Sequence, residues 1–117
     1  MILDIDVKRH TMSSLTPEGK VKGKLAAMLK AMRVWYFVPG NNGYGKSGIP
    51  DYVLCWYGRF IGVEVKSAKG KPTDLQLRTG AQIQEAGGKW LIVRNEEDIE
   101  ALESMLIAIR DTYHAGR

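Results

Sequence analysis

The sequence predicts an α/β fold in which a mixed central β-sheet is flanked by helices. Four short runs are rich in β-branched and aromatic residues, three longer segments repeat apolar residues at helical spacing, and the two kinds of segment alternate. The expected order is helix, three strands, helix, strand, helix. That order is typical of a mixed sheet with helices packed against it.

The amino-terminal third predicts an arm, a helix and a strand. Residues 1–15 are expected to form an arm or edge segment, because apolar residues alternate there with aspartates. A helix should follow, since Thr16 is a good N-cap and Pro17 suits the first helical position. Residues 34–38 then predict a strand, and residues 39–48 a glycine-rich loop. The apolar residues of the helix recur at helical spacing: Val21, Leu25, Met28, Leu29 and Met32.

A hairpin is predicted by two β-rich runs, residues 51–57 and 60–66. Gly58-Arg59 joins the two runs, and glycine at the first central position suits a two-residue type II′ turn. In that register, Asp51 lies opposite Lys66.

Three ionisable side chains fall on one face of this hairpin. Side chains alternate faces along a strand, so Asp51, Glu64 and Lys66 share a face, with Asp51 and Glu64 as a diagonal pair roughly 7 to 8 Å apart. This face is apolar near the turn and becomes ionic only at the end far from it. The opposite face is expected to be continuous core, made of Leu54, Trp56, Ile61, Val63 and Val65.

This ionic cluster has two interpretations. It could be a salt-bridge ladder on a solvated face, but the strands that carry it are apolar on both sides, which favours a buried, coordinating role. Two carboxylates in a partly dry site raise each other's proton affinity unless a cation joins them. Oxygen ligands favour Mg²⁺ or Mn²⁺ over zinc, and Mg²⁺ keeps waters that can be ionised for attack. Lys66 would orient or help deprotonate that water and offset charge in the transition state.

The rest of the chain predicts two helices and a strand. Residues 67–72 form a polar loop, Thr73 begins a helix that ends at Gly87-Gly88, and residues 89–94 form a strand. Asn95 caps a last helix that runs to residue 117 and has an acidic first turn. The apolar stripe of this helix is expected to pack on the core, although the stripe or the amino-terminal arm could instead supply a dimer interface. The stripe residues are Ile99, Leu102, Leu106 and Ile109.

Composition limits the class of protein. A chain of 117 residues is expected to form one domain, residues 1–117, with a single core. The net charge of +4 suits a polyanionic partner but is common in proteins without one. Cys55 is the only cysteine, which excludes an internal disulfide and a cysteine-rich zinc site. No apolar run approaches a membrane span and no signal peptide is recognised, so we expect a protein of the bacterial or phage-infected cytoplasm with no membrane partner.

Four motifs occur in a fixed order: a helix with an early glutamate, a G-x-P-D strand, an E-V-K strand and a T-x-x-Q helix. Together they resemble the PD-(D/E)XK nucleases and, among these, the small stand-alone VRR-NUC (virus-type replication-repair nuclease) family. The resemblance runs from about Glu18 to Arg94. It implies a restriction-endonuclease-like αβββαβ core and hydrolysis of phosphodiester bonds in DNA. It also implies a homodimer that cuts branched DNA, such as Holliday-junction-like four-way junctions or flaps.

The resemblance assigns roles to four positions on the predicted hairpin. Asp51 and Glu64 resemble the metal-binding carboxylates of the family. The carbonyl of Val65 is similar in place to the usual backbone ligand, and Lys66 resembles the catalytic lysine. These roles agree with the chemistry expected of the residues themselves.

Two further residues have both a family role and a local one. Glu18 matches the glutamate of the first helix, which in related enzymes approaches the metal site through waters, yet an acid in a first helical turn is stabilising for dipole reasons alone. Gln76 matches the helix glutamine near the active site, yet Thr73-x-x-Gln76 is also a capping box. Both interpretations stay open for each residue.

A competing motif occurs at Gly40–Ser47, which satisfies G-x-x-x-x-G-K-S and follows a predicted strand. A P-loop needs a helix that starts at its Lys-Ser pair. Here Gly48-Ile49-Pro50 breaks any helix and a strand follows, so we regard the match as accidental. Tyr44 and Lys46 in this loop are still candidates for contact with the DNA backbone or for stacking on a base.

Basic residues continue beyond the E-V-K strand. Lys69, Lys71 and Arg78 are close enough to steer a phosphate strand into the site, although such residues usually meet only solvent. The leading hypothesis is therefore a metal-dependent, structure-selective DNA endonuclease. One alternative is a nuclease-fold protein that binds branched DNA without cutting it, and a more distant one is a P-loop nucleotide-binding protein.

Overall fold

The structure, a computed structural model, describes residues 16–40 and 48–116. The expected arm at residues 1–15 and two candidate DNA-contacting residues, Tyr44 and Lys46, lie outside the described residues. The helices and strands of the described part are α2 (Pro17–Ala31), β1 (Trp35–Phe37), β2 (Tyr52–Trp56), β3 (Arg59–Val65), α3 (Asp74–Glu85), β4 (Lys89–Val93) and α4 (Glu96–Ala115).

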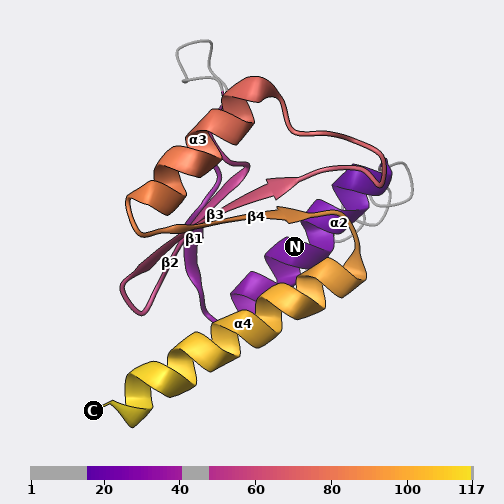
Figure 1. The fold of residues 1–117 in the computed structure, drawn as a ribbon. Helices are drawn as coiled ribbons and strands as arrows, with labels where there is room; N and C mark the ends of the chain where they lie inside the picture. The colour runs from indigo at the N-terminus through magenta and orange to yellow at the C-terminus, as the bar shows by residue number, and fades with distance from the viewer. Residues whose placement is uncertain (1–15, 41–47, 117) are drawn as a thin grey trace.

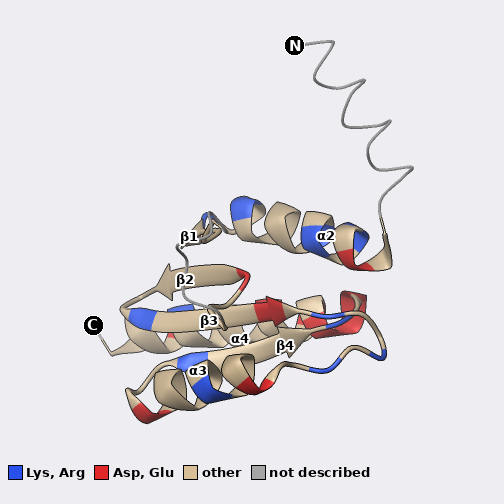
Figure 2. Ribbon diagram, turned by 90° about the horizontal axis from the view of Figure 1, so that it is seen from above, with Lys and Arg blue, Asp and Glu red and all other residues tan. Residues whose placement is uncertain are grey.

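These elements build a four-stranded mixed sheet with helices on both faces (Figures 1 and 2). The strand order is β1-β2-β3-β4, with antiparallel pairing from β1 to β3 and parallel pairing of β3 with β4. The parallel pair needs a crossover, which α3 supplies on one face of the sheet. Helices α2 and α4 contact each other and the sheet on the opposite face. The predicted α/β fold class and element order are confirmed.

The predicted helix starts are also confirmed, because each N-cap side chain accepts a hydrogen bond from a backbone N–H of the first turn. Thr16 Oγ1 accepts from the Gly19 N–H at 3.1 Å. Asn95 Oδ1 accepts from the Asp98 N–H at 2.9 Å. None of the helices in residues 16–40 and 48–116 is long and apolar enough to cross a membrane.

The core lies between the sheet and the pair formed by α2 and α4. The predicted stripe of α4 points into it, because Ile99, Leu102 and Leu106 are buried. Burying side chains of this size stabilises the fold by about 1.5 to 3 kcal/mol each, as an upper estimate. The other large core side chains come from α2 and from strands β2 and β3: Leu25, Leu29, Leu54, Trp56, Ile61, Val63 and Val65.

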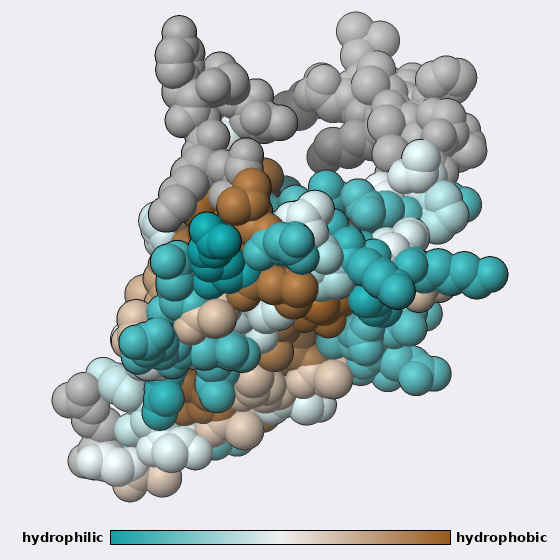
Figure 3. Space-filling view, turned by 45° about the horizontal axis from the view of Figure 1, so that its top comes forward, coloured by the Kyte–Doolittle hydropathy of each residue, from teal (hydrophilic) through white to brown (hydrophobic). Residues whose placement is uncertain are grey.

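The second face of the sheet is covered only in part. Helix α3 packs closely on β4, where a Cβ added at Gly80 would lie 2.4 Å from the ring of Trp90. The same face is open over β1, so that Trp35 and Phe37 are 60% and 48% exposed. In the space-filling view, hydrophobic side chains reach the surface in the middle of the molecule and hydrophilic ones surround them (Figure 3).

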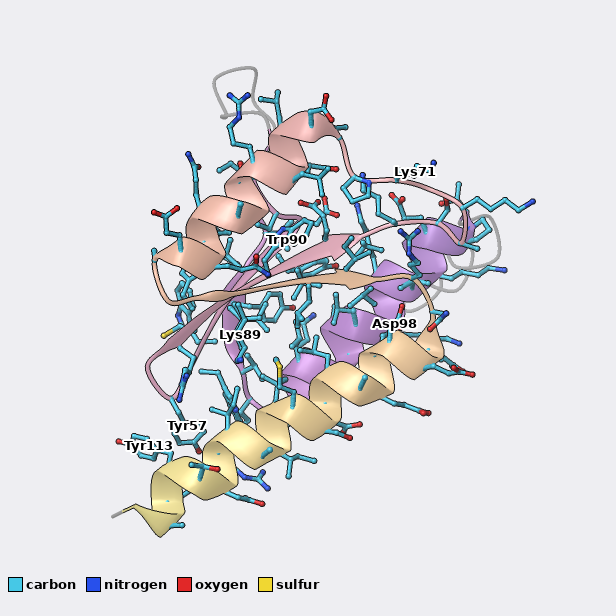
Figure 4. The ribbon with its side chains drawn as sticks, in the orientation of Figure 1. Tyr57, Lys71, Lys89, Trp90, Asp98 and Tyr113 are labelled. Atoms are coloured by element: carbon cyan, nitrogen blue, oxygen red, sulfur yellow. The ribbon has the colours of Figure 1, made fainter. Side chains whose placement is uncertain are left out.

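The predicted hairpin forms, but its turn and register differ from the prediction. The turn residues are Tyr57-Gly58, not Gly58-Arg59, and Trp56 pairs with Arg59. Tyr57 and Gly58 have φ of 49° and 78°, and two positive φ values define the type I′ turn that matches the twist of a hairpin. The ring of Tyr57 lies 4.9 Å from that of Tyr113 on α4, which favours a backbone conformation that tyrosine rarely adopts (Figure 4).

Candidate active site

The corrected register brings the two predicted carboxylates closer together than expected. Tyr52 pairs with Val63, so the next position along each strand sets Asp51 beside Glu64. The predicted pairing of Asp51 with Lys66 and the diagonal placement of Glu64 are therefore wrong. The prediction that the three side chains share a face still holds. The partner of Asp51 moves by two residues, from Lys66 to Glu64, and side chains alternate between faces with a period of two.

Asp51 is fixed by a hydrogen bond to the neighbouring strand. It stands directly before β2, where the chain enters the sheet, and its Oδ2 accepts from the Val65 N–H at 2.8 Å. This bond leaves Oδ1 directed elsewhere, at 4.0 Å from Lys22 Nζ. The carboxylate is thus held in place while one oxygen remains available to a cation.

Glu64 is fully buried and only half satisfied. Its Oε1 accepts from Gln76 Nε2 at 3.2 Å, whereas Oε2 is buried and has no hydrogen-bond partner. The pKa of Glu64 is raised from 4.5 to about 7. Burial of the carboxyl is the main cause of this shift and the Asp51 carboxylate is the second, while the charge of Lys66 opposes it. A buried carboxylate oxygen without a partner is costly, so it indicates a missing cation or proton.

Gln76 makes both kinds of contact that the sequence suggested, one within its helix and one with the candidate site. At the start of α3 its Oε1 accepts from the Thr73 N–H at 2.9 Å, and its own N–H donates to Thr73 Oγ1 at 3.1 Å. These two bonds form the predicted capping box. The same side chain donates its amide to Glu64. Gln76 therefore caps its helix and contacts Glu64 at the same time, and its part in catalysis stays a prediction.

Glu18 reaches Asp51 through a lysine. Its Oε2 lies 3.8 Å from Lys22 Nζ, one turn further along α2, and the same Nζ lies 4.0 Å from Asp51 Oδ1. Lys22 was not singled out in the sequence, where it is one of several lysines on the helix. Its spacing from Glu18, four residues, was the one available signal.

Lys66 and the basic residues after it lie at the same end of the sheet. Lys66 directly follows β3 and is half-buried, and its N–H donates to the Val93 carbonyl at 3.1 Å. Lys69, Lys71 and Arg78 are exposed. Figure 4 shows Lys71 on the loop after β3, and Figure 2 shows acidic segments on β3 and before β2 near the basic segments of that loop.

The loop that carries these lysines is held from β4. Arg94 Nη1 donates to the carbonyls of Ser67, at 2.7 Å, and of Gly70. The Arg94 N–H in turn donates to Asp98 Oδ2 at 2.8 Å, which ties the loop to the start of α4 (Figure 4). The bonds fix the backbone next to Lys66, and no local pattern of residues predicts them.

The residues present fit a hard divalent cation. In the described parts of the chain, no group of three or more His, Cys, Asp or Glu side chains is close enough to hold a metal ion. The candidate donors are therefore two carboxylates, Asp51 and Glu64, with the adjacent Val65 carbonyl. Among them, the unpartnered Glu64 oxygen is the place where a cation would be most needed. Oxygen donors that leave several positions to water are typical of Mg²⁺.

Comparison with solved structures identifies the architecture. A structure described as a "VRR_NUC domain" superposes with a TM-score of 0.66 and 26% sequence identity, over 75% of this chain and 95% of that chain. The chain is therefore similar to this VRR-NUC domain in both fold and sequence. No family model and no curated protein matches the sequence.

This likeness indicates a nuclease of the VRR-NUC kind. The VRR-NUC assignment agrees with the structure around the P-loop-like motif. After Gly48, the described chain continues through Pro50 into β2, and no helix follows the Lys-Ser pair. The site that matches a nuclease is instead the one at the ends of β2 and β3.

Proposed function

We propose that this VRR-NUC protein is a deoxyribonuclease that uses Mg²⁺ or Mn²⁺ held by Asp51, Glu64 and the Val65 carbonyl. One observation carries the proposal, namely the buried Glu64 oxygen that has no partner beside a second carboxylate. If the site were only structural, apolar side chains in place of the two carboxylates would cost less stability. Such a pair is stable when a cation joins the two oxygens.

The residues around the pair have separate tasks in this proposal. A bound Mg²⁺ or Mn²⁺ supplies an ionisable water and stabilises charge on the phosphate. Lys66 would orient the attacking water or help to deprotonate it, and would offset the charge that develops on the phosphate oxygens. Gln76 holds the buried carboxylate in one orientation by its hydrogen bond to Oε1. Glu18 acts at a distance, through water.

We further propose branched DNA, such as a four-way junction or a flap, as the preferred substrate. Exposed basic residues surround the loop after β3, and a phosphate strand that reaches the carboxylates passes close to them. Lys69, Lys71 and Arg78 are the described candidates, and Tyr44 and Lys46 are candidates in the undescribed loop.

A homodimer is proposed together with this substrate, with residues 1–117 of each copy as one nuclease domain. The apolar stripe of α4 is not available as an interface, because it packs in the core. The exposed aromatic side chains of β1, Trp35 and Phe37, are the better candidates. Half-exposed aromatic side chains offer roughly 100 Å² each, so two fall well below the roughly 800 Å² per partner of a stable interface and need further surface. Sedimentation at several protein concentrations tests the dimer.

A cleavage assay tests the catalytic proposal. Labelled junction, flap and linear DNA of one sequence are incubated with the protein and Mg²⁺, Mn²⁺ or EDTA. Asp51→Asn and Lys66→Ala should abolish metal-dependent cleavage, whereas Lys30→Ala, an exposed lysine of α2, should not. Binding of junctions without cleavage by the wild type would favour a non-catalytic DNA-binding protein. ATP hydrolysis that is lost in Lys46→Ala would instead favour a P-loop protein.

A further inference from the structure

Lys22 occupies a position between two carboxylates that come from different parts of the chain. Its Nζ lies 3.8 Å from Glu18 Oε2 on the same helix and 4.0 Å from Asp51 Oδ1 at the start of β2. The side chains of Lys22, Glu18 and Asp51 are 39%, 42% and 30% exposed. The ammonium group therefore lies beside Asp51, one of the two carboxylates of the candidate site.

The backbone of Lys22 is fixed against the strand that carries Asp51. The hydroxyl of Tyr52, a buried residue next to Asp51, donates to the Lys22 carbonyl at 3.3 Å. An ordinary surface pair between residues four apart on a helix would need no such anchor. The contact with Asp51 is thus set by the packing of α2 on β2, and Lys22 belongs to the site.

The charges at this site conflict once a divalent cation is present. An ammonium 4.0 Å from a carboxylate neutralises part of its charge, and it repels a metal ion that approaches the same carboxylate. Lysine has a flexible four-carbon stem and a compact charge with three donors, so its head can leave one partner for another without moving the helix. A phosphate group of bound DNA is the partner that a displaced ammonium would meet beside Asp51.

We propose that Lys22 is the counter-charge of the metal-free site and becomes a phosphate-binding residue when metal and DNA bind. In the metal-free protein its ammonium holds Asp51 and Glu18 together. In the loaded protein it leaves Asp51 and contacts a phosphate of the strand to be cut. This inference rests on the proposed function, because it assumes that metal and DNA share the Asp51 site.

Two measurements on the full chain test the proposal without relying on cleavage. The first is the affinity of the DNA-free protein for Mn²⁺ by calorimetry, in wild type, Lys22→Met and Lys22→Arg. Lys22→Met removes the repelling charge, so it should bind Mn²⁺ about three- to tenfold more tightly, and Lys22→Arg should resemble the wild type. The matched control is Lys30→Met, which makes the same charge change roughly 12 Å further along α2 and should leave the affinity unchanged.

The second measurement is the salt dependence of junction DNA binding, with Ca²⁺ in place of Mg²⁺. Loss of one phosphate contact should flatten the slope of log affinity against log salt by about 0.7 to 0.9 in Lys22→Met, while Lys22→Arg keeps the slope. Both results are required, and unchanged Mn²⁺ affinity or an unchanged slope in Lys22→Met overturns the proposal. A wild type that cleaves no DNA overturns the proposed function instead, and the two Lys22 readouts remain interpretable. Thermal melting in EDTA confirms that each variant is folded.

Discussion

The raised pKa of Glu64 makes a quantitative prediction about the metal-free protein. The carboxyl has a pKa of about 7 in the folded state and 4.5 as its reference value. The folded state therefore holds the proton more tightly than the unfolded state, and the free energy of unfolding must fall as pH rises between these two values. Well below pH 4.5 the glutamate causes no loss of stability, and the loss levels off only well above pH 7.

The size of this effect follows from the two pKa values. Integrating the linkage relation for one site gives a loss of roughly 2 to 3 kcal/mol between pH 5 and pH 8. Glu64→Gln keeps the shape and the hydrogen-bond acceptor for Gln76 but cannot ionise. The wild type should therefore lose that much stability relative to Glu64→Gln over this pH range.

Urea unfolding in EDTA at pH 5 and pH 8 measures the difference. The comparison uses Glu64→Gln and a control, Glu100→Gln, which changes an exposed glutamate of α4. Comparing variants at each pH removes the contribution of other groups that titrate in the range. If wild type and Glu64→Gln differ by the same amount at pH 5 and pH 8, the buried carboxyl does not titrate as argued and the reasoning fails.

Three further predictions concern neighbouring positions. Mn²⁺ at about one hundred times its dissociation constant should stabilise the wild type at pH 8 by about 2.7 kcal/mol in the same unfolding assay, and Asp51→Asn should lose most of this gain. Gln76→Glu should keep the helix cap yet reduce cleavage, because the new carboxylate repels Glu64. Gln76→Ala should reduce cleavage and also lower the free energy of unfolding by about 1 kcal/mol. Measuring both unfolding and cleavage rates separates the two roles. Gly80→Ala should destabilise the protein by about 1 to 3 kcal/mol because the added methyl meets Trp90, and a melting temperature equal to that of the wild type would contradict this packing.

The sequence determined most of the fold because its local signals agreed with one another. The N-caps at Thr16 and Asn95, the capping box at Thr73 and the apolar stripe of α4 each predicted an element that the structure contains. Local hydrogen bonds and apolar spacing act within a few residues, so they can be read without knowledge of the fold.

The predicted position of the hairpin turn was wrong, and this changed the predicted geometry of the site. Glycine normally supplies positive φ, so Gly58 alone suggested a turn that begins at that residue. The actual turn begins one residue earlier, at Tyr57, whose ring packs against Trp56 and Tyr113. Tyr113 is at the far end of the chain. Contacts of this kind depend on the packing of α4 and are not visible in the local sequence.

Lys22 was missed for a related reason. Among lysines that recur along a helix, the one that matters is selected by the crossing of α2 over β2, which the Tyr52 hydroxyl anchors at the Lys22 carbonyl. Helical periodicity gives the face of a residue but not the point at which another element passes it. Residues contributed from a second layer are therefore the part of a site that a single sequence predicts least well.

The same neighbourhood shows how this fold maintains an unfavourable site. Val63 and Val65 alternate with Glu64 on β3, and both valines are buried on the opposite face of the sheet, so the strand is fixed by core packing. The register then places Asp51 beside Glu64 regardless of the repulsion between them. Hydrogen bonds from the Val65 N–H and from Gln76 hold one oxygen of each carboxylate and leave the other for a cation. The stability of the core thus offsets the cost of a site that is arranged for metal binding before the metal is present.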